Sequence, residues 1–570
     1  MQTAQPPVRR PDIICRGATS SWFIALGLGI GWLSTAWVYA QTELVRYVAL
    51  TGADGNSGTA LSPWRTLQHA ADRATPGTTV LVQPGTYFEK VQIRVSGSAT
   101  GGYITFQANG PVVLSGTGVA GAHMIYLKNR SYVRIVGFDI RDNTKVNTGS
   151  GIWIDGTGDH LELRNNRVHE IRGADAMGIA VYGRSAVSPI TDLVIEGNEI
   201  FDCDPAHSEA LVLNGNVTRF RVANNLVHDV NNIGIDFIGG EGTCPDPEQD
   251  AARDGVCVGN RVWRARSIYG GGYGAGIYVD GGRNIVIEGN EVQQCDLGIE
   301  VGAENPGRIT SGVIVRGNFI HRNDKVGLIF GGYEAAAGRV VDCQFLNNTC
   351  YKNDILADGN GEIAIQYADR NIIRNNIFFC GLQNILLTSL TQSTGNVLDY
   401  NLWFAEVGAD RAVFVWGGVT VRGLDRFRAR STQGQHSVFS DPRLADADQG
   451  GFHLLPESPA IDAGSPGNAD GAGEVDFDGE PRVSHGVIDI GADEILPLEC
   501  VLFGDRQVRL SWPASFAGLV LEQTLSLSPS IWTEVAEGGG LQSGARMSLL
   551  RPVDQGSLFY RLRTPGTPPF

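Results

Sequence analysis

The chain has 570 residues, of which 75 are Gly, 61 are Asp or Glu and 45 are Lys or Arg. Because this length exceeds one ordinary hydrophobic core, we expect several units or an array of repeats. The formal net charge of −16 argues against a nucleic-acid-binding protein, which needs a basic surface. An acidic polysaccharide would need a local basic groove or a bridging cation to bind.

Residues 1–40 are predicted to be a signal peptide. Arginines at positions 9, 10 and 16 precede an apolar run over residues 22–38, and Ala40 is a small residue before Gln41. An uncleaved membrane anchor is the alternative, because the apolar run nearly reaches the length that spans a bilayer. We expect a secreted or cell-surface monomer that has no membrane segment after cleavage.

The mature chain begins with a predicted strand at residues 47–50, which a turn-rich loop follows. A short helix is then expected to begin at Ser62-Pro63, and one face of it is formed by Leu67, Ala70, Ala71 and Ala74. The exposed end of a stacked sheet invites aggregation, so a helix that lies across this end would protect it.

Asparagines recur through the middle of the chain, each before a predicted strand. The intervals between them are 27 to 35 residues, and the positions are Asn166, Asn198, Asn225, Asn260, Asn290, Asn318, Asn348 and Asn376. Two or three short strands with their turns fill such an interval, which predicts one coil of a solenoid. An inward-pointing Asn can bond to the turns above and below, so we expect a stacked ladder of asparagines.

The beginning of the mature chain contains short sequence motifs that resemble those of a known family. They are Tyr47-Val48, Gly52-Ala53-Asp54-Gly55, Ser62-Pro63-Trp64-Arg65-Thr66-Leu67-Gln68-His69 and Pro84-Gly85-Thr86-Tyr87. This segment resembles the pectate-lyase-like right-handed parallel β-helix superfamily of secreted bacterial proteins. The resemblance implies an all-β fold, a right-handed parallel β-helix (solenoid), over residues 41–405 with the short capping helix at its N-terminal end.

The remaining residues are predicted to form two smaller parts. Residues 406–497 are rich in Gly and Asp and resemble a segment that closes such solenoids; their Asp cluster could hold calcium or could form only Asx turns. Residues 498–570 alternate apolar and polar residues, which predicts a small C-terminal β-sandwich as an accessory module.

Three successive coil strands, at residues 234–240, 276–282 and 298–302, place acidic side chains outward. Strand alternation sends Asp236, Asp280 and Glu300 to the surface opposite the apolar residues. The strand alignment predicts one column of Asp236, Tyr278, Glu300, Ile329 and Gln366. Neighbouring carboxylates raise the pKa of one member and so supply an acid beside a base, as in a glycosidase.

These three carboxylates are therefore the predicted catalytic residues of a polysaccharide-cleaving hydrolase, which requires no cofactor. Aromatic and polar residues around them are candidates for binding the polysaccharide: Trp153, Tyr182, Asn214, Glu241, Tyr273, Tyr278 and Glu304. The alternative is an ordinary solvated acidic face, because a solenoid exposes every second strand residue.

A second hypothesis follows from the resemblance, which implies calcium-assisted β-elimination by a polysaccharide lyase. Glu209 and Asp236 match the positions of calcium ligands, whereas Asn232 and Ile233 do not, and residues 264–282 contain no lysine to act as the base. A third hypothesis is a non-catalytic carbohydrate-binding or cell-surface protein.

Cys244 and Cys257 bracket a polar loop, and we predict a disulfide between them. The other cysteines of the coils are expected to fill the core.

Overall fold

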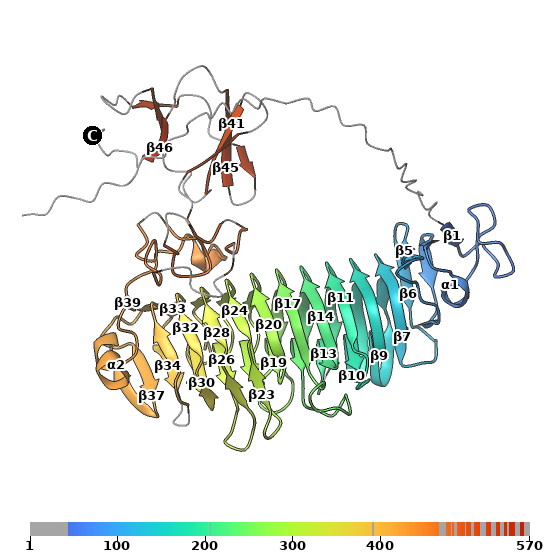
Figure 1. Cartoon of the computed structure of the whole chain (residues 1–570), viewed down its shortest axis with the longest axis horizontal. Helices are drawn as coiled ribbons and strands as arrows, with labels where there is room; N and C mark the ends of the chain where they lie inside the picture. The colour runs from blue at the N-terminus through green and yellow to red at the C-terminus, as the bar shows by residue number, and fades with distance from the viewer. Residues whose placement is uncertain are drawn as a thin grey trace, which may run out of the picture. The chain divides into compact units, whose positions relative to one another are not determined.

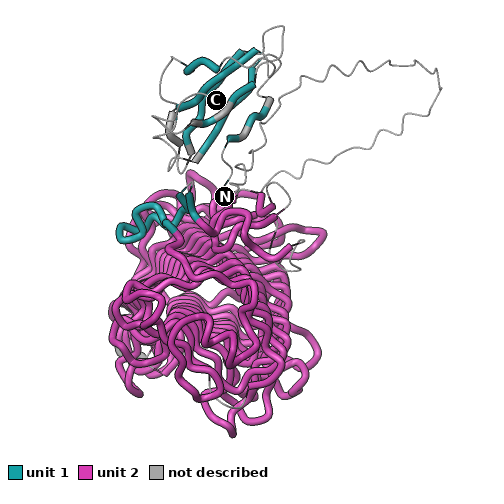
Figure 2. The backbone as a smooth tube through the Cα atoms, turned by 90° about the vertical axis from the view of Figure 1, so that its left-hand side faces the viewer, with its two compact units in different colours: residues 1–41, 443–458, 495–570 teal, residues 42–442, 459–494 magenta. Residues whose placement is uncertain are grey.

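The computed structural model describes residues 44–563 apart from residues 206, 390–392, 456, 467–472, 474, 480, 484–486, 496–497, 503–506, 514–519, 526–531, 536–540, 544–545 and 553–558. The predicted signal peptide therefore lies outside the described residues. No helix of the described chain is long and apolar enough to cross a membrane. Figure 2 shows two compact units, which within the described chain are residues 44–442 with 459–494, and residues 443–458 with 495–563.

The larger unit is a parallel β-solenoid of about 12 turns, as the sequence predicts. Its coils stack side by side between α1 (Leu67–Arg73) at one end and α2 (Leu424–Ser431) at the other (Figure 1). Each typical coil supplies one strand to each of three parallel sheets. For example, β16 (Ile233–Ile238) is followed by β17 (Ala252–Val258) and β18 (Arg261–Ala265). The next strand, β19 (Ala275–Asp280), pairs with β16 in parallel.

The strands of these sheets are short, and three longer ones turn a corner between sheets: β7 (His123–Val136), β9 (Asn143–Arg164) and β10 (Arg167–Gly183). The first sheet, which carries the candidate site, contains β4 (Val91–Ile93), β13 (Glu209–Gly215), β16 (Ile233–Ile238), β19 (Ala275–Asp280), β22 (Leu297–Gly302), β26 (Val326–Gly331), β30 (Ile363–Gln366), β34 (Ile385–Ser389) and β37 (Val413–Trp416).

The second sheet contains β1 (Leu44–Val48), β2 (Thr78–Val82), β5 (Ile104–Ala108), β11 (Ile190–Glu196), β14 (Val217–Ala223), β17 (Ala252–Val258), β20 (Arg283–Glu288), β23 (Ile309–Ser311), β24 (Ile314–Arg316), β27 (Arg339–Val341), β28 (Gln344–Leu346), β31 (Ala368–Asp369), β32 (Ile372–Arg374) and β35 (Val397–Asp399). The third contains β3 (Gly85–Tyr87), β6 (Val112–Ser115), β8 (Asp139–Arg141), β12 (Glu199–Cys203), β15 (Leu226–Val230), β18 (Arg261–Ala265), β21 (Glu291–Gln293), β25 (Phe319–His321), β29 (Thr349–Tyr351), β33 (Ile377–Cys380), β36 (Leu402–Ala405) and β39 (Val438–Phe439).

The interior of the solenoid is apolar because alternate strand residues point into it. Ile235, Phe237, Ile277 and Val279 are typical, and each is fully buried in one continuous core. The residue between two inward-pointing ones points outward. Asp236, between Ile235 and Phe237, and Tyr278, between Ile277 and Val279, therefore lie on the outer surface of the first sheet.

The predicted asparagine ladder is present at the corner between the second and third sheets. All eight predicted asparagines are fully buried. The backbone N–H and the Nδ2 of Asn260 donate to Oδ1 of Asn290 at 2.8 and 3.0 Å, and the same pattern runs from Asn166 to Asn401. Each side chain thus ties one coil to the next.

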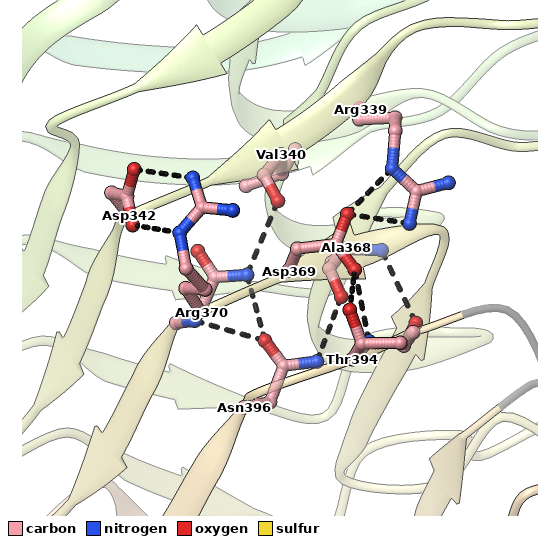
Figure 3. Close-up of polar contacts among 10 residues, drawn as sticks. Arg339, Val340, Asp342, Ala368, Asp369, Arg370, Thr394 and Asn396 are labelled. Atoms are coloured by element: carbon pink, nitrogen blue, oxygen red, sulfur yellow. Dashed lines mark hydrogen bonds and ion pairs between the residues drawn. The ribbon is translucent and has the colours of Figure 1, made fainter.

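A shorter ladder lies at a further corner, which bends the second sheet between β31 and β32 (Figure 3). Asn396 accepts from the backbone N–H of Asn371 at 2.9 Å and donates to the carbonyl of Ala368 at 2.8 Å. Beside it, the guanidinium of Arg370 donates to both carboxylate oxygens of Asp342. The coils are therefore held by side-chain bonds inside and outside the corner.

Helix α1 spans Leu67–Arg73 and buries Leu67, Ala70 and Ala71. The prediction that it begins at Ser62-Pro63 is wrong. Thr66 is the N-cap, because its hydroxyl accepts the backbone N–H of His69 at 3.1 Å. At the opposite end, β38 (Val419–Arg422) pairs with β37 in an antiparallel hairpin, before α2 and the last parallel pairing of β36 with β39.

The smaller unit contains a 3-10 turn, η1 (Ala447–Gln449), and two antiparallel sheets. One sheet has the order β40 (Glu499–Leu502), β41 (Gln507–Pro513), β45 (Arg546–Pro552), β44 (Leu541–Ser543), and the other has the order β43 (Thr533–Glu534), β42 (Val520–Thr524), β46 (Phe559–Arg563).

The predicted disulfide is absent, because Cys244 and Cys257 are both free, buried thiols. Cys257 points from β17 into the core, where its Sγ lies 3.3 Å from Nδ2 of Asn260. The loop is fastened instead by Asp250, whose carboxylate accepts the backbone N–H groups of Cys244 and Gly242 at 2.8 and 2.7 Å.

Candidate functional site

The predicted column of outward residues exists on the first sheet over most of its length. Asp236 pairs with Tyr278, and Tyr278 pairs with Glu300. The column departs from the prediction at β30, where Gln366 pairs with Gly331 of β26 and not with Ile329. Such a shift of two residues leaves Gln366 on the same outer surface.

The loop over residues 354–361 accounts for this shift. The Asp354 carboxylate accepts the backbone N–H groups of Asp358, Gly359 and Gly361 at 2.7 to 3.2 Å, and so fixes how the chain enters β30.

Two of the three outward carboxylates, Asp236 and Asp280, are buried, so they do not form a solvated acidic face, whereas Glu300 is half-buried. Asp236 is 2% exposed, Asp280 is 5% exposed and Glu209 is 7% exposed. The loop after β22 lies over Asp280, because the backbone N–H of Glu304 donates to Asp280 Oδ1 at 2.8 Å. The hydroxyl of Tyr278 in turn donates to the carboxylate of Glu304 at 3.2 Å.

The carboxyl cluster is electrostatically unusual because, among the described residues, no Lys or Arg forms an ion pair with it. Its members are Glu209, Asp236, Glu241, Asp280, Glu300 and Glu304. Burial raises the pKa of Asp280 to about 7, and the charges of Glu304 and Glu241 add to the rise. Burial likewise raises the pKa of Glu300 to about 8, with Glu304 and Asp280 as further causes. At neutral pH the Glu300 carboxyl is therefore mostly protonated and can donate a proton.

Burial and like charges also raise the pKa values of Asp236 and Glu209. Burial raises the pKa of Asp236 well above its usual range, and the charges of Glu209 and Asp280 raise it further. Burial also raises the pKa of Glu209, as do the charges of Glu241 and Asp280. Burial and neighbouring negative charges therefore favour the protonated form of both carboxyls.

A pocket of about 540 Å³ opens beside this cluster on the outer surface of the first sheet. Its polar lining includes Glu300, Glu304, Asp358, Asn360 and Gln366, and its other lining residues are Ile233, Tyr273, Tyr278, Leu297, Ala303, Ile329, Gly331 and Tyr333. Asp236 and Asp280 are not part of the lining. Of the predicted catalytic residues, the pocket therefore presents Glu300 directly.

Tyrosines form the walls, and two of them are held in place. Lys325 lies with Nζ 3.7 Å from the ring centroid of Tyr273 and donates to the carbonyl of Gly271 at 2.7 Å. A glycine is required at position 302, because a Cβ atom there would approach the Tyr278 hydroxyl to 2.6 Å.

The other residues predicted to bind substrate lie outside the pocket lining. Trp153 stacks on Tyr182, with ring centroids 4.7 Å apart and 4° between the planes, and His123 lies 4.4 Å from Trp153 on a neighbouring coil. Asn214 donates to Oε2 of Glu241 at 2.7 Å, while its own buried Oδ1 has no hydrogen-bond partner.

Three lining residues, Tyr333, Asp358 and Asn360, are not among the site residues predicted from the sequence. A signal was available, because Asp358-Gly359-Asn360-Gly361 is a turn-forming insertion before a coil strand. Gln366 stood in the predicted column, yet it was not assigned a role.

The oxygen donors of the cluster have the chemistry that calcium prefers. Their geometry fits a metal less well. Two groups of three or more ligating side chains come within 4.8 Å of one another in the described chain, and neither includes Glu209 or Asp236. Glu209 and Asp236 therefore do not form a compact metal site with a third ligating side chain of the described chain.

Comparison with known proteins establishes the family. The family described as "Right handed beta helix region" matches residues 255–421. The protein YwoF of Bacillus subtilis, whose recorded name is "Uncharacterized protein YwoF", is 33% identical over 466 residues, which cover 77% of this chain and 98% of YwoF. The chain belongs to the YwoF family. Its resemblance to the pectate-lyase-like right-handed β-helix superfamily is confirmed.

Solved structures are similar to this YwoF-family chain at low sequence identity. The GH136 lacto-N-biosidase of Eubacterium ramulus is 15% identical, with a TM-score of 0.43, 64% of this chain covered and 67% of that one. Pectate lyase Pel9A is 16% identical, with a TM-score of 0.34, 80% of this chain covered and 96% of that one. Similarity at this level describes the fold alone.

Proposed function

We propose that this chain is a secreted enzyme that hydrolyses glycosidic bonds of a polysaccharide. The observation that carries the proposal is Glu300, a carboxyl group with a pKa of about 8 in the lining of a tyrosine-walled pocket. A general acid must hold its proton at the working pH and must reach the substrate, and Glu300 meets both requirements.

In this proposal Glu300 donates its proton to the glycosidic oxygen as the bond to the sugar breaks. Glu304, the exposed carboxylate of the same pocket, removes a proton from the attacking water. Water thus adds across the bond, one sugar leaves with the proton of Glu300, and proton exchange with solvent restores both carboxyls. The hydroxyl of Tyr278 donates to Glu304 and so orients it.

Asp280 and Asp236 have positioning roles in this mechanism. Asp280 accepts the backbone N–H of Glu304 at 2.8 Å, and its charge helps to keep Glu300 protonated. Asp236 is a second buried carboxyl, and the charge of Asp280 helps to raise its pKa. Neither lines the pocket, so we do not assign them contact with the sugar.

Calcium-assisted β-elimination is the second candidate, and Asn214 is the observation that favours it. Its buried Oδ1 lacks a partner next to the carboxylate of Glu241, and such an oxygen suits calcium. Calcium would have to be held by Glu209 and Asp236, although in the described chain neither belongs to a group of three ligating side chains within 4.8 Å. A bound ion would supply a positive charge for a uronate carboxylate.

We also infer that α1 caps the solenoid and that the two antiparallel sheets of residues 499–563 form the predicted β-sandwich. Export through the N-terminal segment would place this enzyme where polysaccharides occur.

A panel of polysaccharides, assayed with and without a calcium chelator, tests the proposed function. Hydrolysis predicts new reducing ends, no unsaturated product and no effect of the chelator. Ultraviolet-absorbing products that disappear with chelator would support the lyase. Binding without turnover of any polysaccharide would support a non-catalytic carbohydrate-binding protein.

A further inference from the structure

The charge of the pocket bears on the kind of polysaccharide that it accepts. Three carboxyl-bearing residues, Glu300, Glu304 and Asp358, line it, and no Lys, Arg or His is among the lining residues that the structure describes. Glu304 and Asp358 are exposed side chains, so they face whatever enters the pocket.

Two cationic side chains of the neighbouring segments, Lys325 and Arg308, interact with other groups. Lys325 is 9% exposed, lies against the Tyr273 ring and donates to a backbone carbonyl. Arg308 follows Glu304 on the same loop, but its guanidinium donates to the carbonyl of Pro247 at 3.2 Å. Neither side chain lines the pocket, so within the described part of the chain a negatively charged sugar would meet carboxylates without a compensating cation.

We infer that the pocket selects a polysaccharide without acidic groups, built from neutral or amino sugars, and rejects polyuronides. This inference rests on the proposed function, since it names the substrate class of the same site. A uronate carboxylate in the pocket would lose water and meet like charge, and both effects weaken binding. Sugar hydroxyls have suitable partners in Glu304, Asn360 and Gln366, while the rings can lie against Tyr273 or Tyr333.

Binding measurements on the full mature chain test this selection. The Glu300→Gln variant is titrated calorimetrically, in the presence of chelator, with cello-, xylo- and chito-hexasaccharides and with hexamers of galacturonate and mannuronate. At least one neutral or amino hexamer is expected to bind, and the uronate hexamers are expected to bind at least tenfold more weakly. Added sodium chloride should reduce this difference, because salt screens repulsion between charges.

A charge-removal variant identifies the cause of the difference. Adding Glu304→Gln and Asp358→Asn should improve uronate binding at least threefold relative to neutral binding. Asp410→Asn, at an exposed position in the turn before β37, is the control and should leave the ratio unchanged.

The outcomes separate the inference from the function on which it rests. Uronates that bind as tightly as neutral hexamers, or a ratio that the charge-removal variant does not change, would overturn the inference and leave the hydrolase proposal standing. A panel on which no hexamer binds would overturn both.

Discussion

Replacing Asp280 by Asn should make the protein more stable at neutral and alkaline pH. The carboxyl is 5% exposed, and its pKa is raised to about 7 from an ordinary value of 3.8. The folded state therefore holds this proton more tightly than the unfolded state, and the wild-type protein loses stability as pH rises from about 4 to above 7. At 1.36 kcal/mol per pKa unit, this loss is at most about 4 kcal/mol.

An Asn side chain keeps an oxygen that can accept the backbone N–H of Glu304 but cannot ionise. The variant should resemble the wild type near pH 4 and exceed it by about 2–4 kcal/mol in unfolding free energy near pH 8. Urea unfolding at both pH values, followed by circular dichroism, measures this. The exposed control Asp410→Asn should show no gain. Equal pH dependence in wild type and Asp280→Asn would refute the reasoning that burial and like charge raise this pKa.

Three further outcomes are expected. Asn260→Ala should lower the unfolding free energy by about 3 kcal/mol, because it leaves buried backbone groups of the ladder unpaired; urea unfolding measures this, and an unchanged midpoint would contradict the ladder. Alkylation of the unreduced, denatured protein should label both Cys244 and Cys257, because both are free thiols. Mass spectrometry measures the labelling, and protection of both residues from alkylation would support the disulfide instead. Lys325→Met should raise KM several-fold with little change in kcat, because Tyr273 loses its cation contact; steady-state kinetics would contradict this role if kcat alone fell.

The solenoid could be predicted from the sequence because its determinants repeat. Asn198, Asn225 and Asn260 occupy equivalent corners, and one inward bond to the next coil explains their spacing. The same periodicity fixed the register that places Tyr278 between Asp236 and Glu300. A repeated pattern carries this information because each coil meets the same neighbours.

The burial of the carboxylates could not be predicted in this way, because irregular loops produce it. The contact of Glu304 with Asp280 depends on the path of the chain after β22, which follows no period. The loop at Asp358 likewise changes both the pocket wall and the register of β30. The error at Cys257 has a related cause, since its spacing from Cys244 does not reveal that its side chain points into the core.

The most direct test of Glu300 as the acid compares two substrates in wild type and Glu300→Gln. One is the best natural polysaccharide, and the other is a dinitrophenyl glycoside of the same sugar, whose leaving group needs no proton. The proposed role predicts that kcat falls at least a hundredfold on the polysaccharide but less than tenfold on the dinitrophenyl glycoside. Equal losses on both substrates, or full activity of the variant on the polysaccharide, would contradict it.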